Sequence, residues 1–424
     1  MRNVMKKIFV LTLIIASAYA VAQSNPAGND SLSPAERSIG EARRAIEKKP
    51  TQYSGYNLLA MALARRARET SDVSFYTQAE DALQKSLALA PGNLDGEKIH
   101  VWLLLGRHEF AAALDSARVL NKRVPDDVLI YGFLTDANAE LGNYKDAEMA
   151  AQWMLDLRPG NLPGVTRAAY LRELFGDVDG ALELMDMAYQ STPPTETEDR
   201  AWILSQMAHL RIVSGKTNEA EKLLQQALAL FPGYHYALGN LAKVRVQQKR
   251  YDQAVDLLQR RFNAAPHAEN LYDLAEALEL AGRPDDARKA FAEFETKSLL
   301  ESVRADNSNR ELIFYYADHV HQPLKALDVA KQEYTRRHDV YTLDAYAWSL
   351  HLNSQDMEAR QHIEAALAVG VHDARMLSHA GEIALKLGDR SAAQRYLQDS
   401  AALNGPGSEQ ARLTLAALMP RSQK

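Results

Sequence analysis

Apolar and polar positions follow the period of α-helices along most of this 424-residue chain. From Pro34 onward, apolar residues recur at three- and four-residue spacing, which places them on one face of a helix. Strand-like alternation with a period of two is scarce. The pattern therefore predicts an all-α protein whose helices extend from about residue 34 to residue 418.

Prolines at near-constant intervals divide this helical pattern into units. The successive gaps are 34, 34, 34, 39 and 34 residues, between Pro91, Pro125, Pro159, Pro193, Pro232 and Pro266. An alanine stands twelve residues before each proline, at Ala79, Ala113, Ala147, Ala181, Ala220 and Ala254. A small residue at a fixed distance from a helix breaker, repeated every 34 residues, indicates stacked helix pairs.

A glycine turn divides each unit into two helices. The pattern Gly-x-x-x-x-Ala occurs at Gly106–Ala111, Gly142–Ala147, Gly176–Ala181, Gly215–Ala220, Gly282–Ala287 and Gly388–Ala393, with looser copies at Lys249–Ala254 and Ser354–Ala359. Glycine can adopt the left-handed conformation that ends a helix, and the alanine lets the second helix approach the first. In the second unit Gly106 and Pro125 disagree in phase by two residues, from which we expect a longer second helix.

Helix, glycine turn, alanine-marked helix and proline together resemble the tetratricopeptide repeat. The best unit, Asp126 to Pro159, contains Tyr131, Leu134, Gly142, Tyr144, Ala147, Ala151 and Leu155. The resemblance implies a right-handed α-solenoid (superhelix) of about ten tetratricopeptide helix-turn-helix repeats with capping helices, over residues 34–418. The ten expected pairs are 51–91, 92–125, 126–159, 160–193, 194–232, 233–266, 267–302, 303–339, 340–371 and 372–405, between lone helices at 34–49 and 408–418.

Three stretches depart from the period. The first pair is long, and its extra residues, Arg68 to Tyr76, are expected to extend a helix or its turn. A five-residue polar insertion around Pro193 to Glu198 is expected to bulge. Phe291 to Val303 is typical of one longer helix, and the solenoid is less regular from 296 to 323.

The N-terminal sequence has the pattern of a secretory signal peptide. Arg2, Lys6 and Lys7 precede an apolar run, and Ala20-Val21-Ala22 offers small residues for cleavage before Gln23. We expect a signal peptide at 1–22, a flexible linker at 23–33 and a short tail at 419–424, with an uncleaved anchor as the alternative. An exported protein is thus predicted, periplasmic or else extracellular.

Composition and charge narrow the classes of function. The chain is 46% hydrophobic and 25% charged, as soluble globular proteins are. Its net charge of −6 becomes −9 without the leader, so electrostatics give no reason to expect nucleic acid. It contains no cysteine, which excludes disulfides, thiol nucleophiles and thiolate metal sites. No integral membrane span is expected after signal cleavage.

Candidate chemistry is limited to histidines in the C-terminal part. Seven lie there: His319, His321, His338, His351, His362, His372 and His379. No HExxH, phosphate loop, GxSxG or GxGxxG motif occurs, so we predict no enzyme activity, cofactor or metal. A metal-binding or hydrolytic protein using these histidines remains an alternative.

The resemblance also implies where a partner would bind. In tetratricopeptide arrays the first helix of each pair lines the concave groove, and the groove candidates are Trp202, His209, Tyr236, Lys243, Tyr272, Tyr315, Tyr341, Trp348 and His351. Exposed aromatic rings would anchor a polypeptide, whereas the simpler interpretation is that they pack between helices. We therefore predict a non-enzymatic scaffold that binds a protein or peptide partner. A subunit of a cell-envelope assembly or polysaccharide-export complex is the alternative.

Overall fold

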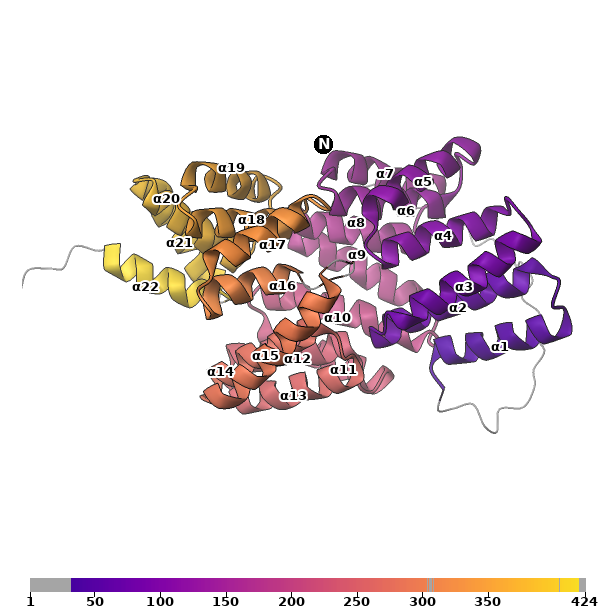
Figure 1. Ribbon diagram of the computed structural model, residues 1–424, viewed down its shortest axis with the longest axis horizontal. Coiled ribbons are helices and arrows are strands. Elements are labelled where there is room, and N and C mark those ends of the chain that lie inside the picture. Colours follow the sequence, from indigo (N-terminus) through magenta and orange to yellow (C-terminus); the bar gives the residue numbers. More distant parts are fainter. Residues whose placement is uncertain (1–31, 303, 305–306, 308, 404, 419–424) are drawn as a thin grey trace, which may run out of the picture. The chain divides into compact units, whose positions relative to one another are not determined.

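The computed structural model describes residues 32–302, 304, 307, 309–403 and 405–418. The predicted signal peptide (1–22) and tail (419–424) lie outside the described residues, as does the predicted linker except its last two positions. From Ser33 onward the chain forms one compact unit. All regular elements among the described residues are helices (Figure 1).

The helices form ten antiparallel pairs between two single helices, α1 (Pro34–Lys48) and α22 (Ser408–Leu418). The first five pairs are α2 (Tyr53–Thr70) with α3 (Ser74–Leu89), α4 (Leu94–Gly106) with α5 (Phe110–Arg123), α6 (Val128–Glu140) with α7 (Tyr144–Leu157), α8 (Leu162–Leu174) with α9 (Val178–Ser191), and α10 (Thr197–Val213) with α11 (Thr217–Leu230). The last five are α12 (His235–Gln247) with α13 (Tyr251–Ala264), α14 (Ala268–Leu280) with α15 (Pro284–Glu301), α16 (Asn309–Phe314) and its π-helical continuation η1 (Tyr315–His319) with α17 (Pro323–Tyr334), α18 (Val340–Leu352) with α19 (Asp356–Leu367), and α20 (Ala374–Lys386) with α21 (Arg390–Leu403). The predicted solenoid of ten helix pairs with capping helices is confirmed.

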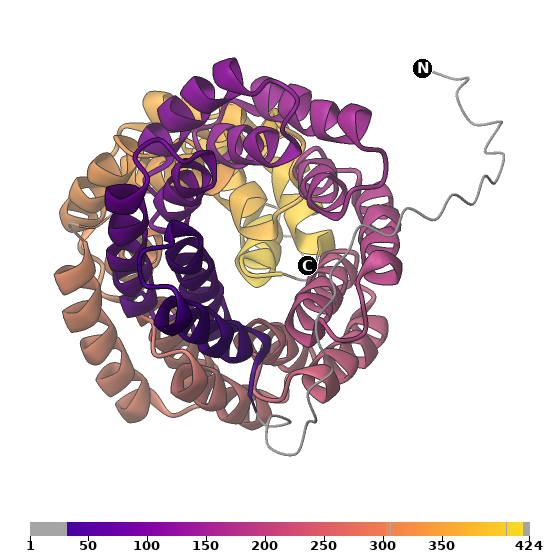
Figure 2. The same ribbon diagram turned by 90° about the vertical axis from the view of Figure 1, so that its right-hand side faces the viewer.

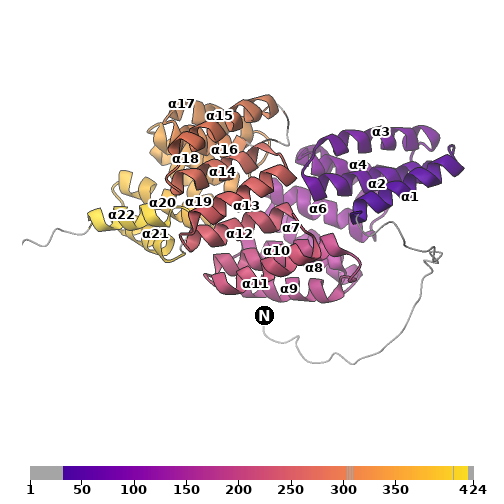
Figure 3. The ribbon, with the colours of Figure 1, turned by 90° about the horizontal axis from the view of Figure 1, so that it is seen from below.

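Within the compact unit the pairs follow one another around a common axis (Figure 2). First helices of successive pairs contact each other, as α2 does α4, α4 does α6, and α6 does α8. The same holds for α10 with α12 and for α16, α18 and α20 in turn (Figure 3). Because these first helices touch from repeat to repeat, they line the inner side of the curved stack, and the second helices lie outside.

Local sequence explains where the helices begin and end. Side chains of Asn93, Asp127, Asn161 and Asp373 accept backbone N–H groups at the starts of α4, α6, α8 and α20. The alanine of each pair is buried at the contact between its two helices, and Ala147 has no exposed surface. A larger residue there would separate the two helices, so the regular spacing of these alanines marks the position where the helices of each pair touch.

The second pair corrects the predicted turn. Gly106 is the last residue of α4, and an added Cβ there would lie 2.5 Å from the Tyr76 ring, so this glycine accommodates a neighbouring side chain. The left-handed turn residue is His108, with φ of 58°. Counting from His108 gives Ala113, which is fully buried, as the alanine of this pair. The helix after the turn, α5, has 14 residues like α7, so the expectation of a longer second helix is wrong.

The predicted departures from the period lengthen helices. Seven first helices have 13 residues, whereas α2 has 18 and α10 has 17. The insertion near Pro193 therefore does not bulge, since its residues after Glu196 form an extra first turn of α10. The long helix predicted around Phe291 is present as the 18-residue α15, which ends at Glu301.

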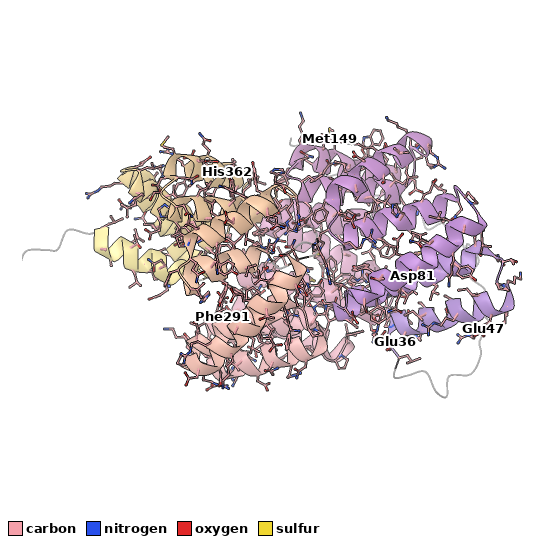
Figure 4. All side chains as sticks on the ribbon, in the orientation of Figure 1. Glu36, Glu47, Asp81, Met149, Phe291 and His362 are labelled. Atoms are coloured by element: carbon pink, nitrogen blue, oxygen red, sulfur yellow. The ribbon has the colours of Figure 1, made fainter. Side chains whose placement is uncertain are left out.

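The outer face is mainly polar with scattered apolar side chains. Glu47 on α1 and Met149 on α7 lie at the periphery of the ribbon, and Met149 is 51% exposed (Figure 4). In the part of the chain that the structure describes, no helix combines the length and the apolar character needed to cross a membrane.

Candidate functional site: the interior surface and its two seams

Two contact regions join helix pairs that are four to six repeats apart. The first, which we call the first seam, joins the end of α2 to the start of α10. Arg68 forms ion pairs with Glu198 and with Asp199, the latter at 2.7 Å between Nη2 and Oδ1. Arg65 pairs with Glu196 at 2.7 Å. Arg68 lies in the extra last turn of α2, and Glu198 and Asp199 lie in the extra first turn of α10, so two of the departures from the period bind each other.

Glu198 is the centre of the first seam. Its side chain has no exposed surface, and it also accepts a hydrogen bond of 2.7 Å from the hydroxyl of Tyr234. Burial opposes the charge of Arg68, but Glu198 and Asp199 outweigh it and raise the pKa of the guanidinium. The backbone carbonyl of Arg68 lies 3.1 Å from Nε2 of His235 on α12. The seam therefore combines a buried ion pair with hydrogen bonds from one further repeat, at the start of α12.

The second seam consists of turns that approach through glycine. The backbone N–H of His338 donates to the carbonyl of Glu140 at 3.3 Å, and that of Val340 donates to the hydroxyl of Tyr144 at 2.9 Å. An added Cβ at Gly142 would lie 2.6 Å from the His338 carbonyl oxygen. One repeat further, an added Cβ at Gly176 would lie 2.7 Å from the carbonyl oxygen of Gly370. Only residues without a side chain fit at these contacts.

Between the seams, a row of carboxylates follows the inner face of α14. Glu269, Asp273 and Glu276 stand four and three residues apart, which places them on one side of a helix. Arg261 forms ion pairs with Glu269, at 3.2 Å, and with Asp273. The three carboxylates keep between 33% and 44% of their side-chain surface exposed. The interior therefore offers an acidic row that is partly neutralised and accessible.

Cations from other repeats lower the pKa of two carboxylates in this row. Burial opposes the ionisation of Glu276, but a hydrogen bond with His319 and the charge of Arg375 outweigh it and lower its pKa. Glu269 behaves similarly, since burial is outweighed by Arg261 and other cations and its pKa is lowered. Burial likewise opposes the charge of His319, yet Glu276 and neighbouring carboxylates raise its pKa. Arg375 on α20 lies 3.7 Å from Glu276, across three repeats.

Two of the predicted groove residues belong to the hydrophobic core. Tyr272 is 3% exposed and Tyr315 is 7% exposed, and both pack against Phe291 and Phe294. This corrects the expectation that these rings face an open groove. The physical reason is that the long α15 supplies two phenylalanines that cover the rings. The Tyr272 hydroxyl lies 3.3 Å from Nε2 of His319.

The C-terminal candidates form a stack. The indole of Trp348 lies parallel to the ring of His379, with centroids 4.2 Å apart, and next to His351 at 5.2 Å. Its N–H donates to Asp318 at 2.9 Å. His351 lies 2.6 Å from Asp356, so its ring is held by a carboxylate. Both candidates remain partly exposed, and whether they contact a partner stays a prediction.

The remaining candidates lie on inner helices. Nε2 of His209 lies 2.7 Å from Glu173 on α8, and Glu173 also contributes to the raised pKa of Tyr341, which burial dominates. On α12, Lys243 is exposed, and burial raises the pKa of Tyr236 to about 12. Trp202 is partly buried against the core. Glu173 thus lies near both His209 and Tyr341, whereas Trp202 packs against the hydrophobic core.

The histidines considered for metal binding are dispersed. His319 contacts Glu276 and Glu279, while His362 packs on Tyr334 and Tyr346. Among the described residues, no group of three His, Cys, Asp or Glu side chains is arranged to hold a metal ion. His351 and His379 each lie within hydrogen-bond distance of one carboxylate, of Asp356 and Asp344 respectively.

Two adjoining cavities lie where the turns of α2–α3 and α4–α5 face α16–α18. The larger, about 880 Å³, is bordered by Tyr76 and Arg304, and the smaller, about 500 Å³, by Arg310 and Glu140. His108 borders both. Sequence reasoning missed these residues because the glycine at 106 was assigned to the turn and because the phase near 310 was unresolved. The signal available in the sequence was a histidine at a position where most repeats have glycine.

Comparison with known proteins agrees with this architecture. The Tetratricopeptide repeat family matches residues 212–271, which lie in α10 to α14. The TPR repeat-containing protein YpiA of Bacillus subtilis (strain 168) is 37% identical over 86 residues. That match covers 20% of this chain and 20% of YpiA, so the chain matches only a fifth of the length of this relative.

Solved structures resemble the fold over longer stretches. Human IFIT1, solved as a dimer with m7Gppp-AAAA, is 14% identical with a TM-score of 0.50, covering 88% of this chain and 96% of that one. PilW, a type IV pilus biogenesis factor, is 15% identical with a TM-score of 0.42, covering 49% of this chain and 94% of PilW. At these identities the likeness concerns the fold alone.

Proposed function

We propose that this chain, which is built of tetratricopeptide repeats, binds an extended polypeptide along its interior surface without making or breaking a covalent bond. A repeat fold of this kind supports protein interaction in general. The observation that carries the proposal for this chain is the accessible row of Glu269, Asp273 and Glu276 on the inner side of α14. Such a row can pair with Lys or Arg side chains of a bound segment.

The neighbouring inner helices supply contacts of other kinds. Lys243 is exposed on α12, the inner helix of the repeat before the acidic row, and Tyr236 and Trp202 lie on the inner helices α12 and α10. Tyrosine and tryptophan offer large contact area together with a polar group, so they suit the recognition of a polypeptide. Shape and charge complementarity along several repeats would then provide the binding energy.

The charge of the interior bears on the class of ligand. IFIT1 was solved with m7Gppp-AAAA, and its likeness to this chain is limited to the fold. The partly exposed carboxylates on α14 would repel a phosphate backbone, whereas they attract basic polypeptide segments. We therefore favour a protein partner. Export from the cytoplasm and a place in a cell-envelope assembly are part of the proposal.

A photo-crosslinking experiment tests this proposal. A benzoylphenylalanine at position 243 or 236 reports the interior, while the same group at Met149, on the outer surface of α7, serves as the control. We expect a discrete crosslinked polypeptide from the two interior positions in cells that make the protein, and its loss when Glu269, Asp273 and Glu276 are replaced by glutamine. Crosslinks of equal yield from position 149, or none from the interior, would overturn the proposal.

A further inference from the structure

The smaller cavity has the walls of a ligand site. Its volume is about 500 Å³, which falls in the range of small-molecule pockets. Residues of the inner helices α4, α6, α8, α16 and α18 border it, together with the α4–α5 turn and the start of α5. Four aromatic side chains line it: Trp102, Phe110, Tyr170 and Tyr341. Such rings form an apolar wall for a ligand of similar shape.

Some charges that line this cavity already have partners. Asp136 accepts from Nε of Arg167 at 2.7 Å. Asp339 lies 3.2 Å from Nε of Arg337 and accepts from the hydroxyl of Thr342 at 2.6 Å. These groups therefore build the wall of the cavity and hold its shape.

Three other polar groups of the same cavity lack a hydrogen-bond partner among the described residues. Arg310 has its nearest carboxylate in its sequence neighbour Glu311, at 3.6 Å, and its guanidinium stacks over the ring of Tyr341 at 5.5 Å. Glu140 has its nearest cation in Arg337, at 3.7 Å. Nδ1 of His108 is buried without a partner. Of these three groups, only Nδ1 of His108 is a fully buried atom without a partner. The side chains of Arg310 and Glu140 are 33% and 27% exposed at the cavity, so both keep hydrogen-bonding capacity for a ligand.

Arg310 and Glu140, each with a long ion pair and no side-chain hydrogen bond among the described residues, have opposite charges. Within the described residues, no ion pair joins the guanidinium of Arg310 to the carboxylate of Glu140, so the two remain separate in the cavity wall. A purely anionic ligand would hydrogen-bond to Arg310 and add no partner to Glu140, and a purely cationic ligand would do the reverse. A ligand that carries both charges satisfies both groups.

Glu140 has an ionisation state that fits this role. Burial raises its pKa to about 7, although Arg337 and Arg310 act in the opposite direction. The titratable groups that face it are Asp136 on its own helix, Tyr144 on α7, Tyr170 on α8, Arg310 on α16, and Arg337 and Asp339 before α18. An ammonium group beside Glu140 would favour its ionised form.

We propose that this cavity binds a small zwitterion with an aromatic or apolar side chain, of the class of free α-amino acids, with its carboxylate on Arg310 and its ammonium on Glu140. The side chain of the ligand would lie against Trp102, Tyr170 and Tyr341. Nδ1 of His108 provides a further hydrogen bond. This site does not depend on the binding of a polypeptide to α14.

Isothermal titration of the purified protein at pH 8 tests the site. The probes are L-phenylalanine, 3-phenylpropionate, which lacks the ammonium, phenethylamine, which lacks the carboxylate, and the dipeptide Gly-Phe. We expect phenylalanine to bind at least tenfold more tightly than either half molecule. Tighter binding of Gly-Phe would assign the site to short peptides instead of free amino acids. If neither phenylalanine nor any other apolar or aromatic amino acid gives heat, the proposal is overturned.

Matched variants separate the ligand contacts from general damage. Arg310→Gln and Glu140→Gln should each weaken phenylalanine binding at least tenfold. Arg375→Gln is the control, because Arg375 likewise forms a long ion pair among the described residues, with Glu276 at 3.7 Å, and stacks on an aromatic ring outside this cavity. Circular dichroism and urea midpoints verify that each variant is folded. Equal loss in the control would contradict the proposal.

The pH dependence gives a readout that a structural role would not reproduce. Since Glu140 ionises as the pH rises through about 7, phenylalanine should bind more tightly at pH 8 than at pH 6. Binding of 3-phenylpropionate should change in the opposite direction, because an ionised Glu140 repels its carboxylate. Glu140→Gln should abolish both trends, and persistence of either trend in that variant would count against this ligand geometry.

Discussion

The two seams join distant repeats by different physical means. In the first seam, long charged side chains from lengthened helices meet around the fully buried Glu198. In the second, backbone meets backbone because Gly142, Gly176 and Gly370 have no side chains to keep the turns apart. A seam of the first kind depends on charge pairing, whereas one of the second kind depends on the absence of volume. The comparison shows that a repeat array can acquire long-range contacts by adding residues or by restricting their size.

The largest expected effect comes from removing the central charge of the first seam. Glu198→Ala leaves Arg68 with only Asp199 and deprives the Tyr234 hydroxyl of its acceptor, so we expect a loss of about 3 kcal/mol in unfolding free energy. Urea denaturation followed by circular dichroism measures it. Glu196→Ala is the control, because its pair with Arg65 is 37% exposed on the carboxylate side and should contribute under about 1 kcal/mol. Equal losses in both variants would show that burial of Glu198 does not matter.

Adding one methyl group tests the second seam. Gly142→Ala combines a strained φ of 75° with a contact of 2.6 Å to the His338 carbonyl, so we expect a loss of about 2–3 kcal/mol. Gly215→Ala is matched to it, because Gly215 has φ of 71° and open space around an added Cβ. That variant should lose only about 1 kcal/mol of unfolding free energy, which is the cost of a left-handed backbone conformation for alanine. The difference between the two variants in urea midpoints isolates the seam, and no difference would mean that these turns do not touch in solution.

The pH dependence of stability distinguishes the second seam from an ordinary surface pair. Folding raises the pKa of the Glu140 carboxyl from 4.5 to about 7, so the folded state favours the protonated carboxyl. The stability that this preference contributes is therefore lost as the pH rises from 4.5 through about 7. Glu140→Gln should therefore gain about 1–2 kcal/mol over the parent at pH 8 and little at pH 4.

Glu221 provides the comparison with the opposite sign. A hydrogen bond with Arg245, 2.6 Å away, lowers the pKa of Glu221 to about 2, so its stabilisation is present above pH 4.5 and fades as the pH falls toward 2. Glu221→Gln should be less stable than the parent at pH 7 and approach it at low pH. Parallel pH profiles for the two variants would contradict the assigned environments.

The smallest effect is expected at the turn beside the cavities. His108 adopts φ of 58°, a conformation that costs a non-glycine residue about 1 kcal/mol. His108→Gly should therefore raise stability by up to about 1 kcal/mol, less the loss of its stacking on Phe110. Lys249→Gly, at an exposed turn with the same φ of 58°, is the control. A stabilised His108→Gly variant with weaker phenylalanine binding would agree with strain retained for ligand contact.

The sequence predicted the repeated part of the fold and missed what joins distant repeats. The period of prolines and alanines predicted the helix pairs because each pair packs on its neighbours in sequence. The partnership of Arg68 with Glu198 has no periodic signal, although both lie in stretches where the period fails. The cavity was missed for a similar reason, since Arg310 follows the irregular segment after α15 and His108 replaces the usual glycine.

Among the groove residues, periodicity assigned the helix but not the neighbours of each ring. Tyr272 and Tyr236 both lie on inner helices, yet Tyr272 is covered by Phe291 and Phe294, whereas Tyr236 is only partly buried. A single sequence does not reveal which side chain of the next helix reaches over a ring. Lys243, Trp348 and His351 keep the exposure that binding requires, and their contact with a partner stays a prediction.

The contacts between Arg68 and Glu198, 130 residues apart, have a consequence for how the chain folds. A solenoid held together only by adjacent repeats unfolds from its ends, and its stability adds up repeat by repeat. Contacts across more than a hundred residues raise the mean sequence separation of the native contacts, which slows folding because long loops must close first. They also couple the first repeat to the fifth, so removal of the N-terminal repeats should destabilise the middle of the chain as well as shorten it.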